Sequence, residues 1–553
     1  MFKFFDKFRN LVPPLSLSRF NLMCAIWLAV GGNFIFYNKA YFYANDNGLP
    51  KSLWIVIVTV CLVAYFNFWL QVFQWKYSAK IMSSILIIIA GIASYFSNNF
   101  GVYISPEQIQ NVMQTDSAEV MQLITSYFWY WCVLFIFLPL LLVWITPIKP
   151  ESFTSRLKAK LLHIIVSIAI LLVLILSNYL NFVHLFREHK EMRYLISPHN
   201  VLNSGYIYLG HLNIEQKPIQ PYGTDAHLSY KANHEAKPRM MVLVVGEAAR
   251  AESFSLNGYR RNTNPKLSLR KDLLNFSQVY SCGTSTAVSV PCMFSGMPRK
   301  NYKPDVAAHR EGLLDIVQRV GYKVTWIDND SGCKGVCDRV DQIEISKSLK
   351  EQYCKDDGFC LDDVLLESFK SYLASIPASD RTPQVVVLHQ RGSHGPAYYN
   401  RTTPAFSPFQ PICNSSSLQD CTHTQIVNSY DNTIVYTDHI LDQILQILEK
   451  DQRYQTGFWY LSDHGESTGE RGEYLHGTTY LIAPSQQKHI PMMMWFSPQW
   501  RESSGDKVDC LFKQQHHILS QDNLFPTFLS LLDIQTETKD PVNDMLKKCQ
   551  NRV

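Results

Sequence analysis

Long apolar segments in the first third of the chain restrict its fold more than any other feature. A helix needs about 20 residues to cross the hydrocarbon core of a bilayer. The third of the apolar segments is short and could be a buried helix of a soluble domain, but its neighbours and the surrounding charges favour a membrane span. We predict five transmembrane helices, at Phe20–Tyr37, Leu53–Phe73, Ile81–Phe96, Tyr127–Ile145 and Leu161–Val183.

Basic residues between these segments predict the orientation of the helices, because Lys and Arg accumulate on the cytoplasmic side of short loops. The basic residues precede the first span, separate the second from the third and separate the fourth from the fifth: Lys3, Lys7, Arg9, Arg19, Lys76, Lys80, Lys149, Arg156, Lys158 and Lys160. The loop 97–126 has no Lys or Arg. We therefore expect the N-terminus inside, the chain after the fifth span outside, and the first span retained as an uncleaved anchor.

The composition agrees with a membrane part joined to a large soluble part. Only 18% of the 553 residues are charged, against about 25% in an average protein, and the deficit lies in the first third. The net charge of +4 excludes nucleic-acid binding driven by bulk charge. We predict a transmembrane domain at 1–183, a turn-rich linker at 184–236 whose short helices either pack or lie along the membrane surface, and a soluble domain at 237–553.

The positions of the cysteines support this topology. Three of the 13 cysteines lie in the predicted spans and ten follow the fifth span. Eight of those ten form close couples along the sequence: Cys282 and Cys292, Cys333 and Cys337, Cys354 and Cys360, Cys413 and Cys421. Such a set is typical of disulfides in an oxidising compartment. A cysteine-rich zinc module is the competing interpretation, but the sequence contains no C-x-x-C pair.

After about Lys237 the pattern changes to short apolar runs separated by segments of helix length. Five runs have the composition of buried strands: Met240–Val245, Lys323–Ile327, Gln384–Leu388, Phe458–Leu461 and Met492–Phe496. They predict a soluble α/β domain. Four of the runs are followed by acidic residues or histidines. Because functional groups gather outside the carboxyl ends of strands in open α/β sheets, we expect a metal site at that edge.

The residues after the first and fourth runs are suitable ligands for zinc, which binds imidazole nitrogen and carboxylate oxygen. Asp463 and His464 follow the fourth run, and Glu247 follows the first. A lone Glu is usually a solvated surface residue, but a carboxylate directly after a buried strand must be paired. His394 and His476 lie in turns that no hydrophobic core requires. Together these five residues predict a metal centre.

A segment rich in small hydroxyl residues, 281–292, contains the candidate nucleophile. Thr286 precedes an Ala-Val pair and could stand at a helix N-terminus, where amide groups and the helix dipole favour an anion. A hydroxyl that binds a metal there can ionise and attack phosphorus. From the local sequence alone, the alternative is a threonine that only caps the helix.

Several blocks of the sequence resemble the membrane-bound phosphoethanolamine transferases of Gram-negative bacteria, which modify lipid A and underlie transferable polymyxin resistance. The most specific blocks are GEAAR at 246–250, FSLNGY at 254–259, the loop 282–292, GSHGP at 392–396 and SDHGES at 462–467. The resemblance runs over almost the whole chain. It implies an inner-membrane protein with five transmembrane helices, a linker and a periplasmic α/β domain of the alkaline-phosphatase and sulfatase type.

The resemblance also implies roles for individual residues. The implied zinc ligands are Glu247, Thr286, Asp463 and His464, with Thr286 also the nucleophile. His394 and His476 would act as catalytic residues around the phosphoryl group or at a second zinc. The implied substrate-binding residues are Asn111, Glu119, Ser331, Lys334, His389 and Glu466. The family's pattern also pairs the four cysteine couples as disulfides. Two departures, Ala248 in place of a common Thr and the absence of histidines from 521–526, bear only on fine specificity.

The implied reaction transfers phosphoethanolamine from phosphatidylethanolamine to a lipid A phosphate through a covalent threonine intermediate. The expected cofactor is Zn²⁺, with one ion firmly bound and a second left open. The expected partners are the lipid donor, the lipid A acceptor and inner-membrane lipids, with no nucleic acid, and we expect a monomer. Two alternatives are transfer to core sugars and a sulfatase-like membrane hydrolase. A lipoteichoic-acid-type glycerophosphotransferase is disfavoured by the number of cysteines, and a non-enzymatic sensor is disfavoured by the Glu/Thr/Asp/His set. The sequence does not decide which phosphate is modified or how Cys510 and Cys549 pair.

Overall fold

The computed structural model describes residues 12–44, 49–115, 117–212, 218–229, 237–355 and 359–547. The chain divides into two compact units. The helical unit comprises Met1–Ile109 and Ile124–Tyr208, and the α/β unit comprises Gln110–Leu123 and Leu209–Val553. The short segment Gln110–Leu123 therefore groups with the α/β unit, although it lies between two apolar helices in the sequence. The basic residues expected at the N-terminus, Lys3, Lys7 and Arg9, fall outside the described residues.

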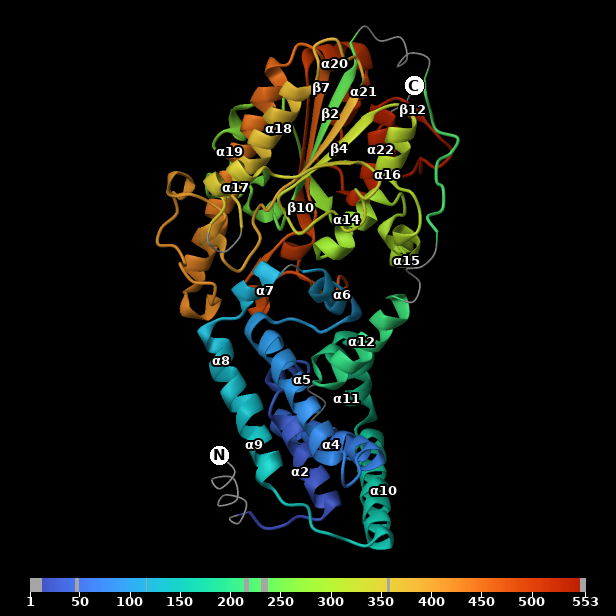
Figure 1. The fold of residues 1–553 in the computed structure, drawn as a ribbon, viewed down its shortest axis with the longest axis vertical. Coiled ribbons are helices and arrows are strands. Elements are labelled where there is room, and N and C mark those ends of the chain that lie inside the picture. The colour runs from blue at the N-terminus through green and yellow to red at the C-terminus, as the bar shows by residue number, and fades with distance from the viewer. Residues whose placement is uncertain are drawn as a thin grey trace. The chain divides into compact units, whose positions relative to one another are not determined.

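The helical unit is drawn mainly in blue and blue-green in Figure 1. Its main elements are α2 (Leu17–Val30), α3 (Phe34–Phe42), α4 (Lys51–Phe73), α5 (Ala79–Phe100), α8 (Ser126–Cys132), the π-helical turn η1 (Val133–Phe137), α9 (Leu138–Ile145), α10 (Phe153–Ser177), α11 (Tyr179–Val183), η2 (His184–Glu188), η3 (Lys190–Leu195) and α12 (His199–Leu212). Helix α4 packs against α2 and α10. Inside this packing Asn67 donates a hydrogen bond of 2.9 Å to Ser167, a type of contact that joins helices in an apolar environment.

Four helical stretches are long and apolar enough to cross a membrane, and they confirm the second to fifth predicted spans. They are Lys51–Phe73, Ala79–Phe100, Ser126–Ile145 and Phe153–Ser177. The first predicted span, Phe20–Tyr37, falls on α2 and α3, which are bent by 60° at a short break and so are not one continuous helix. Gly31, Gly32 and Asn33 occupy the break, where glycine weakens the helix and the Asn33 amide donates to the freed Leu28 carbonyl at 2.8 Å. Within the described residues, the chain thus has five spans if this bent pair counts as one.

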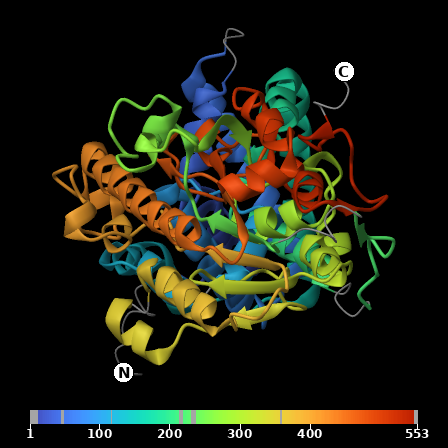
Figure 2. The same ribbon diagram turned by 90° about the horizontal axis from the view of Figure 1, so that it is seen from above.

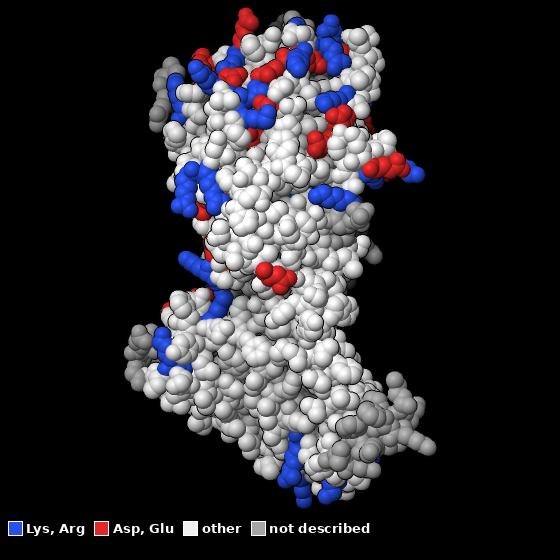
Figure 3. All heavy atoms as spheres, turned by 90° about the vertical axis from the view of Figure 1, so that its left-hand side faces the viewer, with Lys and Arg blue, Asp and Glu red and all other residues white. Residues whose placement is uncertain are grey.

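The surface of the helical unit suits a lipid environment. On the face shown in Figure 3 it carries few charged side chains, whereas charges of both signs cover the α/β unit. Large apolar side chains of α10, such as Leu162, Ile165 and Leu176, are exposed. Exposed apolar area on this scale marks a surface that meets membrane rather than water.

The α/β unit is built on an eight-stranded sheet in the order β11-β3-β10-β7-β2-β6-β4-β5. The strands are β2 (Arg239–Gly246), β3 (Leu274–Tyr280), β4 (Lys323–Asp328), β5 (Asp341–Ile343), β6 (Gln384–His389), β7 (Gln455–Ser462), β10 (His489–Phe496) and β11 (Leu519–Ser520). All five predicted strands are confirmed. Strands β2, β4, β6 and β7 run parallel, whereas β10 runs antiparallel to β3 and β7. The sequence analysis missed β3, which is only half-buried, and the short β5 and β11.

Helices cover both faces of this sheet, as Figures 1 and 2 show. The helices packed on the two faces include α14 (Thr286–Phe294), α16 (Leu313–Arg319) and α22 (Leu524–Leu531) on one side and α18 (Asp363–Ser375) and α19 (His423–Lys450) on the other. The unit also contains α7 (Ser117–Leu123), α15 (Pro304–Ala308), α17 (Lys347–Tyr353), α20 (Pro498–Ser504), α21 (Lys507–Phe512) and the part of α6 (Pro106–Gln114) that starts at Gln110. Two short strand pairs, β1 (His227–Leu228) with β12 (Ile534–Gln535) and β8 (Ser467–Thr468) with β9 (Tyr474–Leu475), complete the unit.

Alternate residues of the central strand β2 enter two separate cores. Met241 and Val245 pack with α14, α16 and α22, whereas Met240 and Val244 pack with α18 and α19. This division follows from the two-residue period of a strand. Because both faces of the sheet are buried, the sequence of β2 is a continuous apolar run. Packing on both faces fixes its position in the sheet.

Among the described residues, four disulfides brace the loops of the α/β unit and confirm the predicted couples. They are Cys282–Cys292, Cys333–Cys337, Cys354–Cys360 and Cys413–Cys421. Cys24, Cys61 and Cys132 are free, as their positions in the apolar helices require. The sequence left the pairing of Cys510 and Cys549 open, and Cys549 falls outside the described residues.

Candidate active site

The carboxyl ends of the central parallel strands meet at one edge of the sheet. Strand β2 lies between β7 and β6, and β6 lies next to β4. In register, Gly246 pairs with Ser462, Val245 with His389, and Asp328 with His389. The residues that follow these strands therefore emerge side by side. This is the edge at which the sequence predicted the site.

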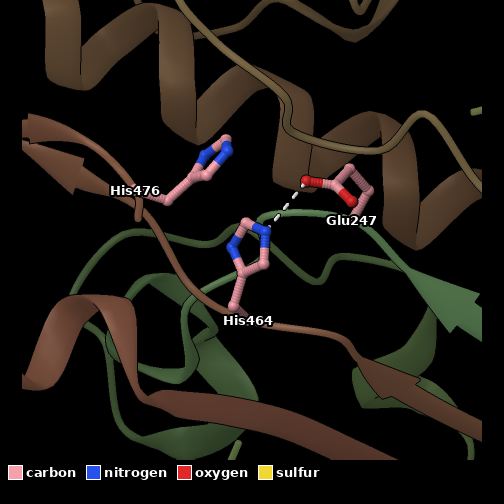
Figure 4. A group of neighbouring side chains, drawn as sticks. All are labelled: Glu247, His464 and His476. Atoms are coloured by element: carbon pink, nitrogen blue, oxygen red, sulfur yellow. Dashed lines mark ion pairs between the residues drawn. The ribbon is translucent and has the colours of Figure 1, made fainter. Parts of the chain in front are cut away.

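Three of the four predicted zinc ligands surround the ring of the fourth, His464. Its Nε2 lies 3.4 Å from Glu247 Oε1, 3.3 Å from Asp463 Oδ2 and 3.4 Å from Thr286 Oγ1. The Thr286 hydroxyl donates to Glu247 Oε2 at 3.0 Å. Figure 4 shows Glu247 and His464 pointing toward each other. All four side chains are buried.

The hydrogen bonds of these side chains fit a bound cation. The Nδ1 of His464 lies 2.9 Å from the Gly465 carbonyl, so it carries the proton and Nε2 presents a lone pair. Glu247 Oε1 and Asp463 Oδ2 are buried and have no hydrogen-bond partner among the described residues. Buried carboxylate oxygens without a donor are unfavourable unless a cation pairs with them. The donor set of imidazole nitrogen and carboxylate oxygen is one that zinc prefers.

The pKa values of Glu247 and His464 show which protonation states the site favours when no cation is bound. Burial, reinforced by the charge of Asp463, raises the pKa of Glu247 well above its ordinary value. Burial also lowers the pKa of His464 to about 4. An ionised Glu247 and a neutral His464 are the forms that bind a metal. The pocket therefore already keeps the histidine neutral, while the carboxylate needs a positive partner to ionise.

Thr286 is the first residue of helix α14. Ser285 takes the N-cap position, so Thr286 is not the cap that the local sequence allowed as an alternative. The first amide groups of a helix lack partners within it and attract anions. The Cys282–Cys292 disulfide ties the loop before α14 to the helix itself. The Thr286 hydroxyl thus lies at a helix end that can bind an anion and close to the carboxylates of Glu247 and Asp463.

A second histidine borders the site from strand pair β8–β9. A nitrogen of His476 lies within 4.8 Å of the ligand atoms of Glu247 and His464, and Figure 4 shows its ring beside that of His464. Its Nδ1 contacts Glu466 Oε2 at 2.8 Å, and Glu466 also accepts from the Tyr398 hydroxyl. Burial lowers and the Glu466 charge raises the pKa of His476, with a net upward shift. Glu466, predicted to bind substrate, therefore contacts and orients His476.

His394 is paired with a residue from the segment Gln110–Leu123. Its Nε2 lies 2.8 Å from Glu119 Oε1, and its Nδ1 lies 2.7 Å from the Gly395 carbonyl. The His394 and His476 ring centroids are 5.2 Å apart. Burial raises and His394 lowers the pKa of Glu119, which falls to about 2. The structure thus brings together two predicted residues that are far apart in the sequence.

The remaining predicted residues lie on the β4 and β6 side of the site. His389 Nδ1 contacts Asp328 Oδ2 at 3.0 Å. The Lys334 ammonium donates to Ser331 Oγ at 2.9 Å and to the Gln114 carbonyl at 3.1 Å. Lys334 has a φ of 53°, which is uncommon for a residue with a side chain. Asn111 is half-buried on α6.

The sequence analysis did not select Asp330 or Arg391 as site residues. Asp330 is held by the Arg391 guanidinium at 2.8 Å and forms a metal-capable group with Glu247 and His389. Burial opposes ionisation, but Arg391 holds the pKa of Asp330 well below its usual range. Both residues closely follow predicted strands, so their position near the strand ends could have identified them as site residues.

Comparisons with known proteins agree with this geometry. The family model described as phosphoethanolamine transferase EptA/EptB matches residues 62–212, and the sulfatase model matches residues 239–534. The chain is 37% identical to phosphoethanolamine transferase EptA of Escherichia coli K12, over 97% of this chain and 98% of the relative. It is 32% identical to phosphatidylethanolamine transferase Mcr-1 of Escherichia coli, over 96% and 97%.

A solved structure extends the similarity to the whole fold. The integral membrane protein lipooligosaccharide phosphoethanolamine transferase A (EptA) of Neisseria meningitidis superposes with a TM-score of 0.91 at 35% identity. The superposition covers 97% of this chain and 99% of that one. Sequence and fold agree over nearly the full length, in the helical unit and in the α/β unit alike. The chain therefore belongs to the EptA family of phosphoethanolamine transferases.

Proposed function

We propose that this protein transfers phosphoethanolamine from phosphatidylethanolamine to a phosphate of lipid A, through a covalent intermediate on Thr286. The observation that carries the proposal is the position of the Thr286 hydroxyl, 3.0 Å from Glu247 and 3.4 Å from His464 at the start of α14. Relatives named for phosphatidylethanolamine transfer and for lipooligosaccharide support the donor and the acceptor class.

Glu247, Thr286, Asp463 and His464 would hold one zinc ion. The unpartnered oxygens of Glu247 and Asp463 and the free Nε2 of His464 support this assignment. Bound there, zinc supplies a lowered hydroxyl pKa and positive charge near phosphoryl oxygens.

In the first half-reaction the oxygen of Thr286 attacks the phosphorus of the donor. The bond from phosphorus to the Thr286 oxygen forms, and the bond from phosphorus to the diacylglycerol oxygen breaks. The hydroxyl proton already points at Glu247 Oε2. His476, whose pKa is raised on balance, donates a proton to the departing oxygen, and Glu466 holds its ring in place.

In the second half-reaction a lipid A phosphate oxygen attacks the same phosphorus, the bond from phosphorus to the Thr286 oxygen breaks, and that oxygen takes back its proton from Glu247 Oε2. The α14 amide groups bind the phosphoryl oxygens in both steps. The product carries an added ammonium group, so the modified surface is less anionic and attracts cationic peptides and polymyxins less. The basic loops predict that the α/β unit works on the periplasmic side of the inner membrane.

Mass spectrometry of lipid A from cells with and without the gene tests this function. We expect a phosphoethanolamine adduct and raised polymyxin resistance only when the gene is expressed. A second measurement follows a radiolabelled head group on purified protein that is denatured in acid after exposure to the donor alone. Label on the Thr286 peptide supports the covalent intermediate. Free phosphoethanolamine without labelled protein would instead support a sulfatase-like hydrolase.

A further inference from the structure

His389 has one nitrogen that no described residue satisfies. Its Nδ1 is bonded to Asp328, which also accepts from the Trp326 indole at 2.8 Å. A histidine whose Nδ1 proton is held by a carboxylate presents its Nε2 lone pair, as metal-bound histidines do. This Nε2 is buried, lies 4.0 Å from Asp330 Oδ2, and has no hydrogen-bond partner among the described residues.

The free nitrogen is directed at a cluster of carboxylates. Ligand atoms of His389, Asp330 and Glu247 all lie within 4.8 Å of one another. A cation that binds such atoms at about 2.0–2.2 Å would draw them slightly closer. Glu247 belongs also to the group formed with His464 and His476. One carboxylate thus stands between two sets of donors, as in two-metal sites whose ions lie about 3.5–4 Å apart.

His394 is a poorer candidate for a second ion, although the family resemblance suggested it. Both of its ring nitrogens are occupied, one by Glu119 at 2.8 Å and the other by the Gly395 carbonyl at 2.7 Å. A metal at His394 would have to displace the buried Glu119 carboxylate. A metal at His389 Nε2 would displace no hydrogen bond of that ring.

The local charge also calls for more than one divalent ion. Four buried or partly buried carboxylates meet here: Asp328, Asp330, Glu247 and Asp463. Arg391 is paired with Asp330 in this cluster and supplies one positive charge. One zinc ion still leaves one net negative charge on these groups, and an incoming phosphodiester adds a second. A second cation would balance that substrate.

We propose that His389, Asp330 and Glu247 bind a second divalent cation beside the zinc, with Glu247 shared by both ions. The inference rests on the proposed function for the identity of the first ion. Two carboxylates and one imidazole suit Zn²⁺ or Mn²⁺. A pocket of about 470 Å³ is lined in part by Asp328, Asp330, Glu344 and Arg391, so it borders one of the three proposed ligands.

Zinc counting on the full-length protein in detergent tests the proposal. The protein is stripped with a chelator, equilibrated with rising free Zn²⁺, and analysed for bound zinc by mass spectrometry of the element. We expect two ions per wild-type chain and one per chain for His389→Ala. Asp328→Asn, which leaves all three ligands in place, should weaken the second ion about 10- to 100-fold.

His439→Ala is the matched control. His439 on α19 also has a nitrogen without a hydrogen-bond partner among the described residues, but it belongs to no metal-capable group, so this variant should retain two ions. One ion per wild-type chain at saturating Zn²⁺ would overturn the proposal, and so would two ions in His389→Ala. A raised KM for the donor in His389→Ala with unchanged zinc would assign this histidine to substrate binding instead.

Thr286→Ala separates this inference from the proposed function. It should lose transfer and keep the second ion, because Thr286 is not one of that ion's ligands. The first ion would keep Glu247, Asp463 and His464, so the expected count stays at two at saturating Zn²⁺. If Thr286→Ala transferred normally, the proposed nucleophile would be wrong, while the zinc count would still decide the second site.

Discussion

Glu119 Oε1 lies 2.8 Å from His394 Nε2, although Glu119 comes from the loop between two membrane helices. Two further contacts hold the same loop on the α/β unit. Gln122 accepts from Arg401 at 2.9 Å, and the Gln114 carbonyl accepts from Lys334 at 3.1 Å. The segment Gln110–Leu123 is therefore part of the active-site wall and not merely a connection between spans.

Glu119→Ala should lower lipid A modification about 10- to 100-fold, the usual cost of losing the carboxylate that orients a site histidine. This fall is measured as the initial rate of lipid A modification by membranes that contain the variant. Glu107→Ala is the control, because Glu107 is an exposed acid on the neighbouring helix α6. Equal activity of Glu119→Ala and wild type would show that the pair with His394 has no role in the reaction.

Thr286→Ala should abolish transfer, with a loss of at least about 1,000-fold, since the nucleophile is removed. Thr286→Ser should keep measurable activity, because a primary hydroxyl can occupy the same position. Thr284→Ser serves as the control, since the Thr284 hydroxyl is engaged with the Thr478 carbonyl at 2.6 Å. Normal lipid A modification by Thr286→Ala would move the nucleophile to another residue.

Replacing both Cys282 and Cys292 with Ser should reduce activity more than stability. The loop that this disulfide closes is short, with a sequence separation of 10, so its contribution to folding should be below the roughly 3 kcal/mol of a 15-residue loop. Its main effect is to hold the start of α14. The free energy of chemical unfolding and the transfer rate, both measured on the same preparation, give the loss of stability and the loss of activity. Detection of Cys282 as a free thiol in the wild type would argue against this role.

A secreted fragment 237–553 should fold, bind zinc and cleave a soluble phosphoethanolamine donor, since Glu247, Thr286, Asp463 and His464 are all present. It should fail to modify lipid A in cells, because it lacks Glu119 and is not held near either lipid, so their effective concentration falls. Donor turnover in solution and lipid A mass in cells are measured in parallel. If the fragment modified lipid A at the same level as the full chain does, the membrane spans would serve only as an anchor.

Asp438 should make the stability of the α/β unit depend on pH. Burial raises its pKa to about 7, although it accepts from the Lys266 and Leu267 amides. The folded state therefore binds the proton more tightly than the unfolded state. The associated stability is present below pH 4 and is lost as pH rises to about 7, at most by a few kcal/mol. Thermal unfolding of fragment 237–553 between pH 5 and 8 should show this fall, and Asp438→Asn should flatten it; an unchanged profile would contradict the assignment.

The sequence determined the membrane part, the five central strands of the sheet and most residues of the candidate site. Long apolar runs have few folded alternatives to membrane spans, and a run such as 240–245 must be buried on both faces. The ends of parallel strands share one edge, so Glu247, Asp463 and His464 could be grouped before any coordinates. The bend between α2 and α3 was missed, because two glycines and Asn33 permit a break without requiring it.

Only the tertiary structure decided which distant side chains touch. No periodicity links Glu119 to His394 or Asp330 to Arg391, since these contacts depend on how a membrane loop and two strand ends converge. Whether His389 or His394 keeps a free nitrogen was equally undetermined, because one is the last residue of β6 and the other follows it by five residues. Hydrogen bonding distinguishes them, and hydrogen-bond partners are set by packing in three dimensions rather than by neighbours along the chain.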